Sequence, residues 1–194
     1  MTWLEFFSSL ASSFAWPSVT AFALYHFKEP LVQAIPRLQR LKYKELEAEF
    51  DRGLEKIEQA AKEGGLEIEA STQVAEDFEE HLRQIAEISP NAAIVEAFRQ
   101  IEQSAKALIR ANGTQPDYKV AAPYRLIERI LETTNMLGKR EVKIFHDLRW
   151  LRNKVTHSES YVATRAQALE YIELASLLVS KIDDALAATS GDTH

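Results

Sequence analysis

The sequence of 194 residues contains no cysteine and only six glycines and six prolines. Without cysteine the chain has no disulfide framework, no thiol nucleophile and no zinc site built on thiolates. Low glycine and proline, together with abundant alanine, leucine and glutamate, favour helices over sheet. A glycine-rich phosphate loop, an HExxH motif and a GxSxG motif are also absent from the sequence. We therefore expect an all-α protein outside the enzyme classes that those motifs identify.

Charge is distributed unevenly along the chain. The net charge of −6 gives no overall basic signature for nucleic-acid binding. Residues 1–27 carry a single charge, that of Glu5, whereas residues 28–44 carry +4. Residues 45–88 carry −10, and residues 89–194 are nearly balanced at +1. The pattern predicts an uncharged head, a basic segment, an acidic arm and a globular module.

The head has the pattern of a transmembrane anchor, which we assign to residues 1–28. No formal charge occurs from Phe6 to Phe27, a stretch of 22 residues. A helix of this length is roughly 33 Å long, enough to cross a hydrocarbon core of about 30 Å. Because the cations follow this stretch, the positive-inside rule places the rest of the chain in the cytoplasm. A buried helix of a soluble protein and a cleaved signal peptide are the alternatives.

Residues 29–65 predict a juxtamembrane amphipathic helix. Pro30 and Pro36 are expected to interrupt the chain where it leaves the membrane, and Pro17 is expected to kink the first helix. Apolar residues then recur at mostly three- and four-residue spacing up to Gly64-Gly65, where the helix should end. This stripe could contact lipid headgroups or pair with a second copy. Residues 66–88 are read as an acidic spacer, with a short helix possible at 74–88.

Residues 89–194 predict an up-down bundle of four helices. Ser89-Pro90 starts the first helix, which stops at Asn112-Gly113. The second is expected to close at Gly138, and the third to run from about 139 to 156. Thr164 and Gln167 form a capping box for the last helix. Its broad apolar face indicates a central position in the bundle or contact with a partner.

The third of these helices carries the only dense basic patch in the module. Cations on such a helix can neutralise a phosphodiester backbone, and we name Lys143, Arg149 and Lys154 as candidate RNA-binding residues. An arginine can hold phosphoryl oxygens, and a histidine can move the proton of a ribose hydroxyl. Arg152 and His157 are five residues apart, so they converge only if the helix loosens after Val155.

The segment 148–157, LRWLRNKVTH, resembles the signature of the HEPN superfamily of helical bundles. That signature is an arginine, a polar residue and, after four to six positions, a histidine, which Arg152, Asn153 and His157 match. Residues 89–102 and 164–172 resemble the first and last helices of such bundles. Residues 14–50 resemble, loosely, a bacterial membrane anchor found ahead of them, which implies a single-pass protein of the inner membrane.

The resemblance implies an activity as well as a fold. Active HEPN proteins are metal-independent endoribonucleases that work as dimers, many of them in phage defence, toxin–antitoxin pairs or stress responses. By this resemblance Arg152 would bind the scissile phosphate, Asn153 would position the groups and His157 would transfer protons, with no metal and no cofactor. Other HEPN-like domains are non-catalytic modules that bind a nucleotide or a protein. The expected partners are RNA, the membrane through residues 6–27, a second copy of the chain and, for the non-catalytic alternative, another protein.

Two readings of the motif therefore stay open. In the catalytic reading, Arg152 and His157 line a cleft shared by two copies. In the structural reading, Arg152 pairs with a carboxylate such as Glu102 or Asp147, His157 caps a helix end, and His146 is a surface residue. Trp150 is expected to serve packing or a dimer interface.

Overall fold

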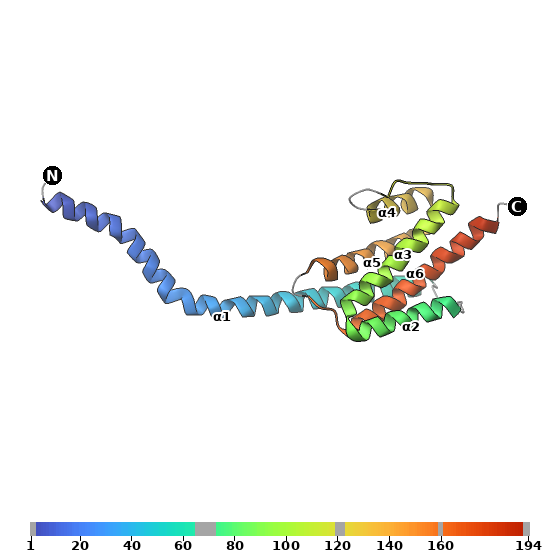
Figure 1. Cartoon of the computed structure of the whole chain (residues 1–194), viewed down its shortest axis with the longest axis horizontal. Coiled ribbons are helices and arrows are strands. Elements are labelled where there is room, and N and C mark those ends of the chain that lie inside the picture. Colours follow the sequence, from blue (N-terminus) through green and yellow to red (C-terminus); the bar gives the residue numbers. More distant parts are fainter. Residues whose placement is uncertain (1–2, 65–72, 119–122, 159–160, 192–194) are drawn as a thin grey trace. The chain divides into compact units, whose positions relative to one another are not determined.

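The computed structural model describes residues 3–64, 73–118, 123–158 and 161–191, and across these ranges its regular structure is entirely helical. The prediction of an all-α protein is confirmed. In chain order the helices are α1 (Trp3–Glu63), α2 (Gln73–Ile88), α3 (Pro90–Ala111), α4 (Pro123–Thr134), α5 (Lys139–His157) and α6 (Arg165–Gly191) (Figure 1). The chain divides into two compact units, residues 1–45 and residues 46–194.

The first unit consists of the leading part of α1. The helix continues through Pro17, Pro30 and Pro36, so the expected interruption at the last two prolines is wrong. A proline removes one hydrogen bond of the helix, and the bonds on either side of it can hold a long helix together. Trp16 and Phe22 are among the large apolar side chains that this unit exposes. Within the described ranges, none of the helices combines the length and apolar character needed to cross a bilayer.

The second unit begins at Leu46, well before the boundary expected at residue 89. The apolar stripe in the last part of α1 explains this, because Phe50, Leu54 and Ile57 are buried. At Gly53 the helix passes so close to α5 that a Cβ atom would lie 2.6 Å from Leu151 Cδ2. The stripe thus packs inside its own bundle from Phe50 onward, where the sequence had suggested lipid contact or pairing with a second copy.

The end of α1 agrees with the expected stop at Gly64-Gly65. The helix ends at Glu63, and Gly64 N–H donates to Ala61 O at 3.0 Å. Arg140 Nη1, from the start of α5, donates to Glu63 O at 3.0 Å. This arginine supplies a hydrogen bond to one of the carbonyl groups that a helix end leaves unpaired.

The acidic spacer is in large part a helix of the bundle, which corrects the expected domain plan. Leu82 and Ala86 of α2 are buried, and α2 packs against α3 and α6. Its acidic residues dominate the composition, whereas its few apolar residues lie on one face and decide the packing. Residues 66–72 of the expected spacer lie outside the described residues, apart from which the segment is helical.

The four expected helices of 89–194 are present, with caps close to those predicted. Ser89 Oγ accepts a hydrogen bond from Ala92 N–H, and α3 is followed by its C-cap Asn112 and by Gly113, which has a φ of +77°. Thr164 and Gln167 form the capping box. Thr164 N–H donates to Gln167 Oε1 at 2.8 Å, and Gln167 N–H donates to Thr164 Oγ1 at 3.2 Å.

The expected closure of the second helix at Gly138 is wrong. α4 ends at Thr134, and Asn135 follows with a left-handed φ of +50°. Thr134 Oγ1 donates to Ile130 O, a contact by which threonine competes with the helical backbone pattern. Gly138 instead precedes α5, where its carbonyl accepts from Val142 N–H.

The core lies between α3 and α6, which run side by side, with α2 and α5 packed on them (Figure 1). The broad apolar face of α6 is used inside the bundle, because it contacts α2, α3 and α5. A partly buried polar network also ties α6 to α1. Gln167 Oε1 accepts from Tyr161 Oη at 2.9 Å, and Gln167 Nε2 donates to Asp51 Oδ1 at 2.5 Å.

Candidate functional site

Arg152 lies half-buried on α5 and faces the interior of the bundle. Its guanidinium carbon is 5.8 Å from the centre of the Phe98 ring on α3, and its Nη1 donates to Asn153 Oδ1 at 3.1 Å. Its Nε is buried without a hydrogen-bond partner among the described residues. The structure therefore brings Arg152 and Asn153 together, and it places the cation against an aromatic ring instead of Glu102 or Asp147.

The charge of Arg152 acts on the buried hydroxyl of Tyr171, a residue of α6. Burial raises the pKa of Tyr171 well above its usual value, while the charge of Arg152 acts to lower this pKa and Glu102 acts to raise it. Tyr171 Oη donates to Leu148 O at 3.0 Å, so the buried phenol hydroxyl joins α6 to α5 by a hydrogen bond. Because its charge affects the pKa of the fully buried Tyr171, Arg152 lies on the side of α5 that faces the interior of the bundle.

His157 is the last residue of α5, and its side chain is exposed. α5 stays helical through His157, with Ser158 N–H donating to Lys154 O at 3.1 Å. The loosening after Val155 that convergence of Arg152 and His157 would require does not occur. On a regular helix, residues five apart point about 140° away from each other. Arg152 and His157 of one chain thus leave α5 in divergent directions.

The three candidate RNA-binding cations are each held by a carboxylate. Lys143 Nζ lies 3.3 Å from Asp147 Oδ2, and Lys154 Nζ lies 2.5 Å from Glu49 Oε2 of α1. Arg149 Nη2 lies 3.1 Å from Glu128 Oε2 of α4. α1 and α4 therefore supply acidic partners to the basic helix, which reduces the positive potential that a phosphate backbone would meet.

The Lys154–Glu49 pair also joins α5 to α1. The hydrogen bond from Lys154, reinforced by its positive charge, lowers the pKa of Glu49 below its usual value. Lys154 Nζ is in addition 4.7 Å from the centre of the Trp150 ring. The lysine is thus engaged on two sides, by a carboxylate and by an aromatic face.

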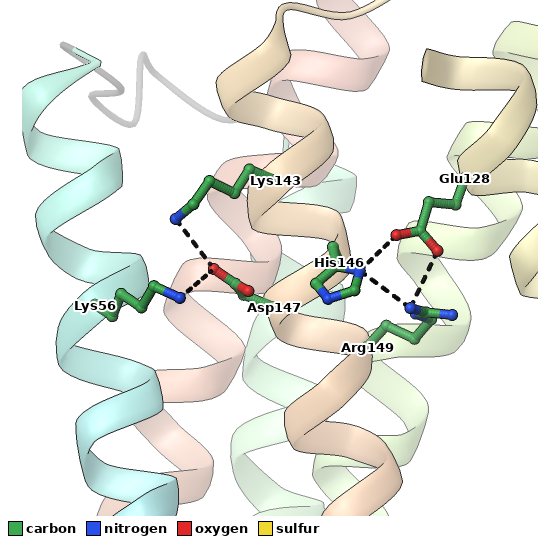
Figure 2. Close-up of polar contacts among 6 residues, drawn as sticks. All are labelled: Lys56, Glu128, Lys143, His146, Asp147 and Arg149. Carbon is green, nitrogen blue, oxygen red and sulfur yellow. Dashed lines mark hydrogen bonds and ion pairs between the residues drawn. The ribbon is translucent and has the colours of Figure 1, made fainter. Parts of the chain in front are cut away.

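A second cluster, which the sequence did not single out, joins α4 to α5 (Figure 2). His146 Nδ1 lies 2.6 Å from Glu128 Oε1, and the other oxygen of Glu128 contacts Arg149. His146 lies at the surface, as expected, with 50% of its side chain exposed, but its contact with Glu128 was not expected. Its partner is a glutamate 18 positions earlier on another helix, so only a knowledge of how α4 packs on α5 could have revealed the contact.

No metal centre is formed by the described residues, since no group of three or more histidine, aspartate or glutamate side chains could hold an ion there. No protein-family model, curated protein or solved structure matches the chain.

Proposed function

We propose that the chain is a HEPN-like helical bundle that serves as a non-catalytic interaction module, attached to the inner membrane by its N-terminal segment. The observation that carries this proposal is the placement of Arg152. Its guanidinium carbon lies 5.8 Å from the centre of the Phe98 ring, and Arg152 points about 140° away from His157 on an unbroken helix. In this reading the HEPN-like motif supports packing, and the outer surface of α5 binds a partner.

Trp150 is the centre of the proposed contact surface. It lies on α5 with 40% of its surface exposed, which is high for so large an aromatic side chain inside a bundle. Tryptophan is enriched among the residues that contribute most to protein–protein binding. A second copy of the chain is the partner that we propose, in line with the homodimer expected from the HEPN resemblance.

Membrane attachment rests on residues 6–27, which carry no formal charge. Trp16, Val19 and Phe22 of this stretch are exposed, with between 64% and 79% of their surface accessible. Exposed tryptophan and phenylalanine on a helix are well suited to a lipid environment. We expect full-length protein to sediment with membranes and to resist carbonate extraction, while residues 46–194 alone should remain in the supernatant.

The interaction surface can be tested with the full chain in mild detergent. We expect a dimer by light scattering, and we expect Trp150→Ser to shift it toward the monomer without changing its helical content. Ile88→Ser is the matched control, because Ile88 is an exposed apolar residue on α2 that lies outside this surface. A monomeric wild type, or a dimer insensitive to Trp150→Ser, would contradict the proposed surface.

A metal-independent endoribonuclease is the second candidate, and the exposure of His157 favours it. Because Arg152 and His157 of one chain diverge, cleavage would require Arg152 of one copy and His157 of a second copy at one phosphate. His157 would transfer a proton in the attack of the ribose 2′-hydroxyl, and Arg152 would stabilise charge on the phosphate. The products would carry a 2′,3′-cyclic phosphate and a 5′-hydroxyl.

An RNA-cleavage assay separates the two candidates. Full-length protein is incubated with mixed RNA and excess chelator, and our first proposal expects no cleavage. His157→Ala is compared with His81→Ala, which removes an exposed histidine from α2. Cleavage that disappears in His157→Ala and persists in His81→Ala would overturn the non-catalytic proposal and establish the second candidate.

A further inference from the structure

The basic segment, residues 28–44, lies in the first unit and directly follows the uncharged stretch of residues 6–27. It contains one anion, Glu29, and five cations: Lys28, Arg37, Arg40, Lys42 and Lys44. The side chains of Lys28, Lys42 and Lys44 are exposed. In contrast to the lysines of α5, none of these three forms an ion pair with a carboxylate among the described residues. Their positive charges are therefore available to a partner.

Tyr25 and Lys28 mark the end of the uncharged stretch. Lys28 Nζ lies 4.8 Å from the centre of the Tyr25 ring, and both side chains are exposed. Tyrosine is enriched at the boundary between hydrocarbon and water, and lysine keeps its aliphatic stem on apolar surface while its ammonium group reaches the polar side. The pair thus suits a membrane surface, with the basic segment on the headgroup side of the boundary.

The basic segment has two chemically different faces. α1 is helical throughout the segment, and positions 37, 40 and 44, all cationic, fall within about 60° of one another on a regular helix. Positions 31, 35 and 38, all leucine or isoleucine, fall on the opposite face. A helix with cations along one face and aliphatic residues along the other is typical of segments that lie in the headgroup layer. Prolines at 30 and 36 allow such a helix to bend away from the direction of the preceding stretch.

We propose that residues 28–44 bind the headgroups of anionic phospholipids, so that the chain prefers a negatively charged membrane surface. The inference rests on the proposed membrane attachment and adds the charge of the lipid to it. Clusters of lysine and arginine beside a membrane anchor bind anionic lipids, at about 1 kcal/mol for each cation near the surface. An RNA backbone carries the same charge, but the adjoining uncharged stretch and the Tyr25–Lys28 pair favour lipid, because neither feature is needed to bind a soluble polyanion.

The test uses the full chain reconstituted in phosphatidylcholine vesicles with a trace of pyrene-labelled lipid, either phosphatidylglycerol or phosphatidylcholine. Energy transfer from tryptophan to pyrene reports which lipid lies beside the chain, since Trp16 belongs to the uncharged stretch. We expect labelled phosphatidylglycerol to associate about fivefold more strongly than labelled phosphatidylcholine, the scale of one cation at a membrane surface. Salt at about 1 M should reduce this ratio, because the Debye length falls to about 3 Å.

A triple variant, Arg37→Gln, Arg40→Gln and Lys44→Gln, removes the cations of one face and introduces good helix formers. We expect its preference for phosphatidylglycerol to fall at least about twofold, because three attractive charges are lost. The matched control makes the same change in net charge at three exposed arginines of the second unit: Arg110→Gln, Arg125→Gln and Arg129→Gln. This control should keep the lipid preference of the wild type.

Flotation of the vesicles in a density gradient separates the possible failures. If the chain floats with neither lipid, membrane attachment is wrong and this inference falls with it. If the chain floats but wild type shows no preference, or if the triple variant keeps the preference, the anionic-lipid inference is overturned while membrane attachment stands. A triple variant that keeps its lipid preference and loses binding of mixed RNA would identify residues 28–44 as an RNA-binding segment instead.

Discussion

Replacement of Phe50 by alanine tests whether the last part of α1 belongs to the bundle. Phe50 is 1% exposed, and its ring centre lies 5.6 Å from that of Tyr161, in the connection between α5 and α6. Removal of a buried phenylalanine side chain typically costs about 3–5 kcal/mol, because the transferred area and the cavity both contribute. For a unit of this size the loss corresponds to a fall in melting temperature of roughly 6–20 °C.

A graded series sharpens the test. Phe50→Leu keeps most of the side-chain volume and loses the aromatic pair with Tyr161, so it should cost only about 0.5–1.5 kcal/mol. Tyr25→Ala is the matched control, because Tyr25 is a 72% exposed aromatic residue of the first unit. We expect this control to leave the unfolding of residues 46–194 unchanged.

Urea titration is the assay. The fluorescence of Trp150 reports on the bundle when Trp3 and Trp16 are both replaced by phenylalanine, and circular dichroism at 222 nm follows the helices. The reasoning is refuted if Phe50→Ala unfolds within about 1 kcal/mol of wild type, since a fully buried ring cannot be removed so cheaply from a packed core. In that case α1 would not pack on α5 and α6 in solution.

Three further predictions concern contacts between helices. Burial, together with neighbouring carboxylates such as Asp51, raises the pKa of Glu170. Ionised Glu170 therefore opposes folding at pH values above this raised pKa, and the free-energy cost is lost as the pH falls and the carboxyl group becomes protonated. Glu170→Gln should therefore raise stability at pH 7 by about 0.5 kcal/mol, and the gain should vanish near pH 4, as measured by thermal melts at both values. Gln167→Ala should cost about 2–3 kcal/mol in urea unfolding, because it removes the hydrogen bonds of Gln167 with Tyr161 Oη, Thr164 N–H and Asp51, and a loss below about 0.5 kcal/mol would contradict the network. Arg140→Ala should speed amide hydrogen exchange in the last turn of α1, where Arg140 bonds to Glu63 O, without a comparable change in α6; equal rates in wild type and variant would rule out this cap.

Much of the fold could be predicted from local sequence signals. Ser89, Asn112-Gly113 and the Thr164–Gln167 pair act on backbone groups within a few residues, so each could be identified without knowledge of tertiary packing. The same holds for the broad face of α6, because its apolar residues exceed what one neighbouring helix can cover.

The errors concern features that depend on distant partners. The acidic composition of α2 suggested a spacer, although its residues Leu82 and Ala86 are buried and α2 packs on α3 and α6. The boundary at residue 89 was misplaced for the same reason, since the partners of Glu49 and Asp51 lie more than 100 positions later. The end of α4 was placed too late, at Gly138, because Asn135 adopts the left-handed conformation three residues earlier and the helix stops before it.

The candidate site was predictable only in part. Neighbours in sequence, such as Arg152 and Asn153, were brought together as the motif suggested. Whether Arg152 faces solvent or core depends on where α3 places Phe98, and this could not be read from the motif. The contact of His146 with Glu128 was missed because two separate helices create it.

During synthesis on the ribosome, α1 is made well before the residues that it packs against. Its buried stripe is synthesised first, but Lys154 and Gln167, which hold Glu49 and Asp51, follow 105 and 116 residues later. At about 5–20 residues per second, the stripe waits roughly 5–25 s for those partners to be made. During that interval an apolar helix face is open to chaperones and to neighbouring nascent chains, so the yield of folded protein should respond to chaperone supply more strongly than its final stability does.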